Sequence, residues 1–99
     1  MMLFSEKVRQ LREEKNIYQK EIASALSIDK PMYCRIERGE RRAKKEQIPI
    51  IAEILQTDPE ELLALWLADQ LTTVVADEMI VAQKALNIVA ENIVEYGKR

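Results

Sequence analysis

Apolar residues recur three or four positions apart through most of the chain, and short polar stretches separate these repeats. The first repeat predicts a helix over about residues 5–15, with Ser5 as the N-cap residue. A second, shorter repeat predicts a helix of about two turns over residues 19–26. No stretch carries a strand signal, so the pattern indicates an all-α fold.

A third helix is expected over about residues 30–38, because good end signals flank this segment. Asp29 is a favourable N-cap residue, and Pro31 fits the first turn, where backbone N–H groups lack intrahelical partners. Gly39 stands where a left-handed C-cap is favoured. The turn before this helix is three or four residues long, which is the spacing of a helix-turn-helix whose second helix can enter a DNA major groove about 12 Å wide.

Two further helices follow a polar loop. The apolar repeat from Ile48 to Leu55 predicts a fourth helix. A fifth is expected to begin at Pro59, because Asp58 can act as its N-cap residue and Glu61 can complete a capping box. The sequence therefore predicts a five-helix domain over residues 1–69.

The last part of the chain carries a heptad pattern. Between Leu71 and Tyr96 there is no Gly or Pro, and apolar residues follow one another in steps of four and three. Such a stripe is about 37 Å long at 1.5 Å per residue, more than a small domain can cover by itself. We therefore expect residues 70–99 to form a long C-terminal dimerisation helix, although the stripe could also fold back over the domain. The expected contact residues are Val75, Met79, Ala82, Leu86, Val89 and Ile93.

The composition narrows the chemistry that the chain can perform. Apolar residues make up 47% of the sequence, with only two glycines and three prolines, which fits a helical globule. Cys34 is the single cysteine and there is no histidine, so the usual disulfides, zinc sites and acid–base catalysts lack their residues. We expect no catalytic residues, no metal, no cofactor and no small-molecule ligand. The apolar runs are too short to span a membrane, so a cytoplasmic protein is expected.

Charge is divided unevenly along the chain. The net charge is −2, but residues 1–45 carry +5 and residues 46–99 carry −7. A phosphate group responds mainly to charges within a Debye length of about 8 Å at physiological salt. The acidic average therefore does not argue against binding of a nucleic acid by the N-terminal part.

The segment QKEIASALSIDKPMYCRIERG, from Gln19 to Gly39, resembles the helix-turn-helix core of the Cro/phage-repressor-like (XRE) family of bacterial DNA-binding proteins. Residues 5–68 are similar to the whole five-helix, lambda-repressor-like domain of that family. The chain departs from the family pattern at Ser27, where the turn often has a glycine. Its small size and the segment GERRAKKEQ are also similar to controller proteins of restriction–modification systems and to small phage-type repressors.

The resemblance implies which side chains face DNA. Residues expected at the base edges are Gln19, Lys30, Pro31, Met32 and Arg35. Residues expected at the phosphates are Arg38, Arg41, Arg42, Lys44 and Lys45. Donors on arginine and lysine suit the O6 and N7 acceptors of guanine, which agrees with these roles. Without the surrounding pattern, the same basic residues would be interpreted as a solvated surface.

The family pattern also pairs an arginine of the first helix with the glutamate of the recognition helix. Arg12 and Glu37 occupy those positions here, so we expect a partly buried ion pair that orients the recognition helix. Its net stabilisation is expected to be small, but loss of one partner should be costly, because it leaves a buried charge unpaired.

The resemblance implies a homodimeric regulator of bacterial or phage transcription that binds double-stranded DNA. Two-fold symmetry would place two recognition helices in successive major grooves, on an inverted-repeat operator. A repressor or autoregulator is the simplest expectation, with RNA polymerase as a further candidate partner. The competing interpretation is an interaction module, such as an antitoxin, whose C-terminal helix docks into a partner protein.

Overall fold

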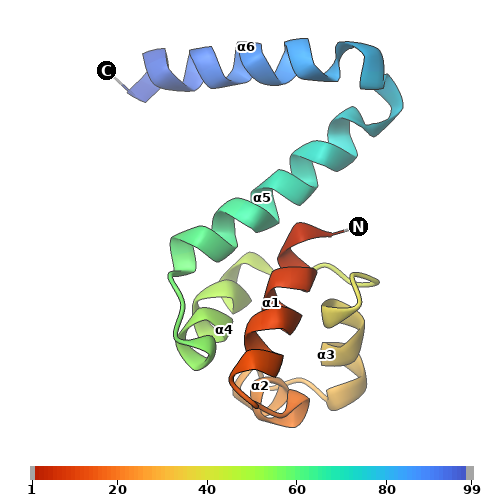
Figure 1. The fold of residues 1–99 in the computed structure, drawn as a ribbon, viewed down its shortest axis with the longest axis vertical. Coiled ribbons are helices and arrows are strands. Elements are labelled where there is room, and N and C mark those ends of the chain that lie inside the picture. Colours follow the sequence, from red (N-terminus) through yellow and green to blue (C-terminus); the bar gives the residue numbers. More distant parts are fainter. Residues whose placement is uncertain (1, 98–99) are drawn as a thin grey trace. The chain divides into compact units, whose positions relative to one another are not determined.

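The computed structural model describes residues 2–97 and is all-helical over that range (Figure 1). The expected fold class, a five-helix domain followed by a long C-terminal helix, is confirmed. The chain divides into two compact units, residues 1–69 and residues 70–99. The α-helices are α1 (Leu3–Glu14), α2 (Gln19–Ala25), α3 (Lys30–Glu37), α4 (Ile48–Leu55), α5 (Pro59–Val75) and α6 (Met79–Gly97), and the short 3₁₀ helices are η1 (Lys45–Gln47) and η2 (Ala76–Glu78).

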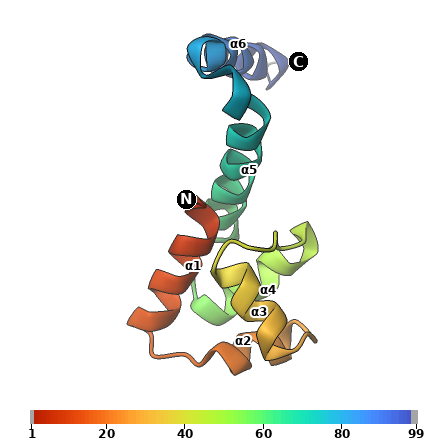
Figure 2. The same cartoon turned by 90° about the vertical axis from the view of Figure 1, so that its right-hand side faces the viewer.

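The first unit has one apolar core, to which each of its five α-helices contributes side chains. Figure 2 shows how α1 to α4 are grouped together. The apolar repeats seen in the sequence supply the inward faces of these helices, as amphipathic helices require. Burial of these side chains from water is the main source of stability for such a unit. The largest fully buried side chains are Val8, Ile22, Tyr33, Ile48, Ile51, Leu55 and Leu62.

The start of α1 differs from the prediction. Ser5 is not the N-cap residue: α1 begins at Leu3, and the buried Ser5 hydroxyl donates a hydrogen bond to the carbonyl of Met2 at 3.2 Å. The helix end is instead capped by Asp69 of α5, whose carboxylate accepts from the N–H groups of Leu3 at 2.8 Å and Phe4 at 3.0 Å. A negative charge suits this end of a helix dipole.

Helices α1 to α4 all end in the same way, with a residue in the left-handed conformation. These residues are Asn16, Ser27, Gly39 and Gln56, with φ values of 55°, 58°, 77° and 54°. In each case the N–H group of the left-handed residue and the N–H group of the next residue donate to carbonyls of the last turn, which is the hydrogen-bond pattern of a Schellman motif. Gly39 and Asn16 are residue types that favour this conformation, so the strained positions are Ser27 and Gln56.

The second unit contains the end of α5, the turn η2 and α6. The single helix expected over residues 71–96 is interrupted at Ala76–Glu78. The four residues before this turn, TTVV at 72–75, are β-branched and lower helix propensity, while Asp77 and Glu78 bring negative charge to the start of α6. None of the helices in residues 2–97 has the length and apolar character needed to span a bilayer.

Candidate nucleic-acid interface

Helices α2 and α3 form the helix-turn-helix of the first unit. Four residues separate them, and Ser27 gives this turn its left-handed position. The start of α3 is well defined, because the Asp29 carboxylate accepts a hydrogen bond from the Met32 N–H at 2.9 Å and a proline occupies the first turn. The N-terminal cap that the sequence predicts for this helix is therefore present in the structure.

Helix α3 has two chemically different sides. Tyr33, Ile36 and Glu37 are buried against the domain. Lys30 and Arg35, two of the residues expected to face DNA, are exposed. Pro31 is also exposed, and Met32 is half-buried. The side of α3 that is available to a ligand is therefore rich in positive charge and has little apolar area.

Gln19, the first residue of α2, is held against α3. Its amide nitrogen donates to the Glu37 carboxylate at 3.3 Å, and its amide oxygen accepts from the Cys34 thiol at 3.1 Å. Gln19 is half-buried, so part of the side chain still reaches the surface. These two contacts fix the start of α2 against the middle and end of α3.

Arg12 of α1 and Glu37 of α3 form a buried, bidentate ion pair. The Arg12 Nε and Nη2 atoms lie 2.9 Å and 2.8 Å from the two carboxylate oxygens, and Nη1 donates to the carbonyl of Ile17 at 2.9 Å. The Glu37 side chain is 2% exposed and that of Arg12 is 15% exposed. The pair therefore ties α1, the turn after it and α3 together, in the arrangement that orients α3.

This pair shifts the protonation equilibria of its neighbours. Burial by itself would raise the pKa of Glu37, but the hydrogen bonds and charge of Arg12, with the bond from Gln19, lower it below its ordinary value. The hydrogen bond with Glu37 raises the pKa of Arg12 further. Burial, together with the nearby Glu37 charge, raises the pKa of Tyr33, whose hydroxyl lacks a hydrogen-bond partner among the described residues. Arg12 and Glu37 are thus both charged at neutral pH.

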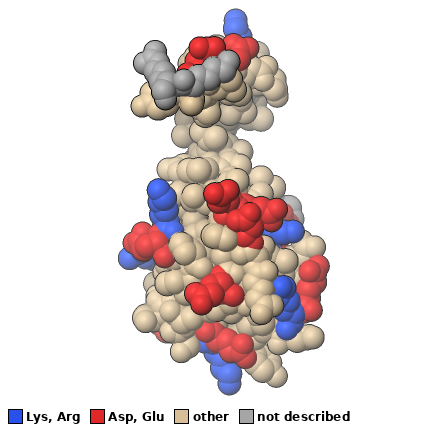
Figure 3. All heavy atoms as spheres, turned by 90° about the vertical axis from the view of Figure 1, so that its left-hand side faces the viewer, with Lys and Arg blue, Asp and Glu red and all other residues tan. Residues whose placement is uncertain are grey.

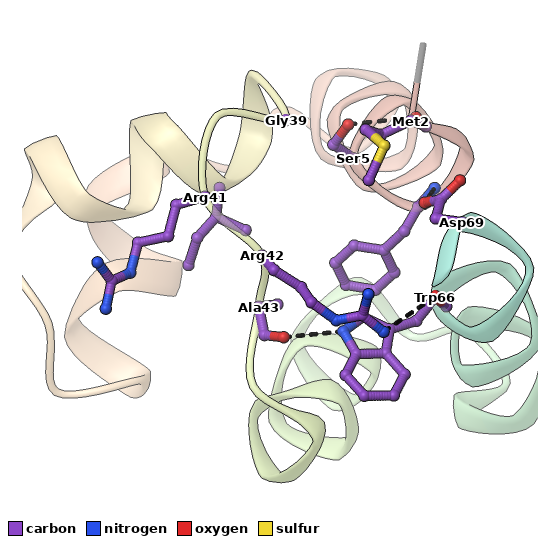
Figure 4. A pocket seen from close by; sticks show the side chains of 10 residues that line it. Met2, Ser5, Gly39, Arg41, Arg42, Ala43, Trp66 and Asp69 are labelled. Atoms are coloured by element: carbon purple, nitrogen blue, oxygen red, sulfur yellow. Dashed lines mark hydrogen bonds between the residues drawn. The ribbon is translucent and has the colours of Figure 1, made fainter. Parts of the chain in front are cut away.

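The basic loop after α3 is exposed, but its residues are not equivalent. Arg38 pairs with Glu40 at 2.6 Å on the surface, and both side chains are more than half exposed. Arg41 points away from the domain interior, whereas the Arg42 guanidinium stacks 3.9 Å from the centre of the Trp66 ring (Figure 4). Lys44 and Lys45 are also exposed. Of the expected phosphate contacts, Arg38 and Arg42 are therefore the ones whose guanidinium groups already contact another side chain of the protein.

Trp66 and Asp69 were not identified from the sequence, although both organise this part of the unit. Trp66 Nε1 donates to the carbonyl of Ala43 at 2.8 Å, and the Trp66 carbonyl accepts from Arg42 at 3.4 Å (Figure 4). A small cavity of about 30 Å³ lies beside them, with room for little more than a water molecule. A lone tryptophan and an acid three residues later on one helix give no sequence signal of such contacts.

The face of the first unit that is turned away from α3 carries charge of both signs. On the face turned away from α3, acidic and basic side chains are interspersed (Figure 3). Among residues 2–97, no three carboxylate or cysteine side chains gather in a way that could hold a metal ion. The exposed, basic side of α3 and the loop after it are therefore the features of this unit that suit a polyanion.

A family model described as a helix-turn-helix domain matches residues 3–65, almost two thirds of the chain. The match runs from the start of α1 into α5 and includes the α2–turn–α3 unit. No curated protein and no solved structure matches the chain significantly. The extent of the match, together with the geometry of α2 and α3, establishes that the chain belongs to the helix-turn-helix domain family of DNA-binding proteins.

Proposed function

We propose that the chain is a sequence-specific regulator of transcription of the XRE type, which inserts α3 into the major groove of double-stranded DNA. The two-sided character of α3 carries this proposal. Its inner side is fixed by Tyr33, Ile36 and the buried Glu37, while Lys30 and Arg35 remain exposed. A helix that is packed on its inner side and carries exposed donors meets the requirement for reading base edges.

The exposed residues of α3 differ in what they can read. Arg35 can donate two parallel hydrogen bonds to O6 and N7 of a guanine, which makes it the main candidate for specificity. Lys30 can donate to the same acceptors, and the half-buried Met32 can contact a thymine methyl group. Pro31 has no N–H group to donate, so it can make only van der Waals contacts with DNA. Gln19 keeps donor and acceptor capacity beyond its two internal bonds and suits a phosphate or an adenine.

Contacts to the phosphate backbone set affinity and its dependence on salt. We assign these contacts to Arg38, Arg41, Lys44 and Lys45, which are all exposed in the segment after α3. Arg42 has a different place in the proposal: its stacking on Trp66 holds the loop so that its neighbours can reach the phosphates.

The regulator is proposed to act as a homodimer on an inverted repeat. Two recognition helices related by a two-fold axis would read half-sites about 34 Å apart, one turn of B-DNA. Occlusion of a promoter, including its own, is the simplest outcome, as for a small phage-type repressor or a restriction–modification controller. Contact with RNA polymerase would give activation from the same complex.

The test is binding of the purified protein to the DNA upstream of its own gene, with competitor DNA, at several salt concentrations. Arg35→Ala should lower affinity for the specific site by about 10- to 100-fold, since a bidentate base contact contributes about 1–3 kcal/mol of discrimination. Arg35→Lys keeps the charge and removes the planar fork, so it should also lose specificity. Lys84→Ala, in the second unit, is the control that removes one positive charge and should leave affinity unchanged. Binding that does not differ from random DNA and does not respond to Arg35 would contradict the proposal.

A further inference from the structure

The loop after α3 holds one acidic residue among basic ones. Residues 38–45 carry five basic side chains, which the proposed function places at or beside the DNA backbone, and Glu40 is the acid among them. Its side chain is 56% exposed. A carboxylate at this position repels phosphate groups. The charge of Glu40 therefore works against the contacts that its neighbours are proposed to make.

The turn at Gly39 brings Glu40 back against the end of α3. Gly39 has φ 77°, and its N–H group donates to the carbonyl of Ile36 at 3.1 Å. The N–H groups of Glu40 and Arg41 both donate to the carbonyl of Arg35, at 2.9 Å and 3.2 Å. The backbone of Glu40 is therefore fixed beside the last turn of α3, which carries the main base-reading residue of the proposal.

The same turn sets Glu40 beside Arg38, the first of the proposed phosphate contacts. Arg38 Nε lies 2.6 Å from Glu40 Oε2, and the two side chains are 63% and 56% exposed. An ion pair this exposed stabilises a fold little. Its effect on binding is larger, because carboxylate and phosphate oxygens accept hydrogen bonds from the same guanidinium N–H groups. A phosphate must therefore displace Glu40, or bind a guanidinium whose charge is already partly neutralised.

We infer that Glu40 is a built-in competitor of the DNA phosphates for Arg38, and that it limits the affinity of the protein for any duplex DNA. The competition does not depend on base sequence, since phosphate contacts carry no sequence information. It weakens the sequence-independent part of binding, so occupancy of a site depends more on the base contacts of α3. This inference rests on the proposed function and adds to it a residue that opposes binding.

Glu40→Gln tests the inference, because it removes the charge and keeps the size of the side chain. On random duplex DNA it should tighten binding by about 3- to 10-fold, since no ion pair has to be broken and no carboxylate repels the phosphates. The slope of log K against log salt should become steeper by up to about 1, as Arg38 gains a full phosphate contact. Glu46→Gln is the matched control. Glu46 is exposed just beyond the segment, and loss of its charge should change affinity by less than about 2-fold.

A double-variant cycle assigns the effect to Arg38. In an Arg38→Ala background, Glu40→Gln should tighten binding much less than it does in the wild type, because the carboxylate has lost the group for which it competes. Equal gains in the two backgrounds would mean that Glu40 acts by general repulsion, and would overturn the inference. Weaker binding by Glu40→Gln would also overturn it, because Glu40 would then orient Arg38 towards DNA. Thermal unfolding of each variant should match the wild type, since these side chains are exposed.

Random duplex DNA is the probe because it isolates the phosphate contacts. The result does not depend on whether the DNA upstream of the gene holds an operator, or on whether Arg35 reads it. The sequence-specific part of the proposed function can therefore fail in its own titration without altering this one. A wild type that does not bind random duplex DNA even at low salt would overturn both.

Discussion

The Glu37 carboxylate on α3 is held by two nitrogen atoms of Arg12 on α1, with Nε 2.9 Å and Nη2 2.8 Å from its oxygens. Glu37 is almost fully buried and lies at the end of α3, opposite the exposed Arg35 side of the helix. The orientation of the proposed base-reading surface therefore depends on a buried charge. The following predictions concern this pair and the other contacts that hold the first unit together.

Arg12→Met should destabilise the protein by about 3 kcal/mol, because it leaves the Glu37 carboxylate buried without its cation. Urea unfolding, followed by the fluorescence of Trp66, measures this loss. The double variant Arg12→Met/Glu37→Met should lose less than the two single variants together, since a buried pair can be replaced by apolar side chains at little cost. An Arg12→Met variant with full stability and full DNA affinity would refute the role of the pair.

The pair also predicts how stability depends on pH. The pKa of Glu37 is lower in the folded protein than its ordinary value of 4.5. The contribution of the ionised Glu37 to the free energy of unfolding is therefore complete above pH 4.5 and is lost as the pH falls through the folded-state pKa. Glu37→Gln should be less stable than the wild type at pH 7, and this difference should shrink as the pH falls below about 4.5. Urea midpoints over this range give the comparison, and a constant difference would contradict the prediction.

Asp69 closes the start of α1 and gives a second stability prediction. Asp69→Ala should cost about 1–2 kcal/mol, because the N–H groups of Leu3 and Phe4 lose their acceptor and the helix end loses a negative charge. Asp69→Asn should cost less, since an amide oxygen can still accept one of the bonds. Ser5→Ala is the control for the residue that sequence alone suggests as the cap. If it destabilised the protein as much as Asp69→Ala, the assignment of the cap would be wrong.

The contrast between these caps explains which features were predictable from sequence. The start of α3 was predicted correctly, because Asp29 and Pro31 act on residues one to three positions away. Local signals of this kind lie within a single helical turn. The cap of α1 was missed because Asp69 is 65 residues from Phe4, and only the packing of α5 brings them together. The position of a long-range contact depends on the whole fold.

The candidate interface follows the same rule. The exposed position of Arg35 follows from the helical period and the buried side of α3, whereas Lys30 is exposed because it is the first residue of the helix. The stacking of Arg42 on Trp66 does not, because it joins a loop to a helix 24 residues away. The break between α5 and α6 was only partly predictable. The β-branched residues at 72–75 could be seen in the sequence, but the heptad pattern continues on both sides of them and predicted one unbroken helix.

Ser27 occupies the left-handed position of the helix-turn-helix turn, at φ 58°. Ser27→Gly should stabilise the protein by about 0.5 kcal/mol, because relief of the left-handed strain exceeds the extra entropy of glycine in the unfolded chain. Ser27→Ala keeps the strain and should change stability little, which makes it the control. The midpoints of thermal unfolding compare the three proteins. A Ser27→Gly variant that is less stable than the wild type would mean that the turn is not strained.

Arg41 and Arg42 are neighbours with different proposed roles, and salt dependence separates them. Arg41→Ala should reduce the slope of log K against log salt by about 1, because one phosphate contact is lost. Arg42→Ala should leave that slope nearly unchanged and should cost about 0.5–1 kcal/mol of stability, since it removes the guanidinium stacked on Trp66. It should also change the emission of Trp66, the single tryptophan of the chain, whereas Arg41→Ala should not. If Arg42→Ala instead lowered the slope as much as Arg41→Ala, Arg42 would leave Trp66 to bind a phosphate in the complex. The stacked arrangement would then belong to the DNA-free protein alone.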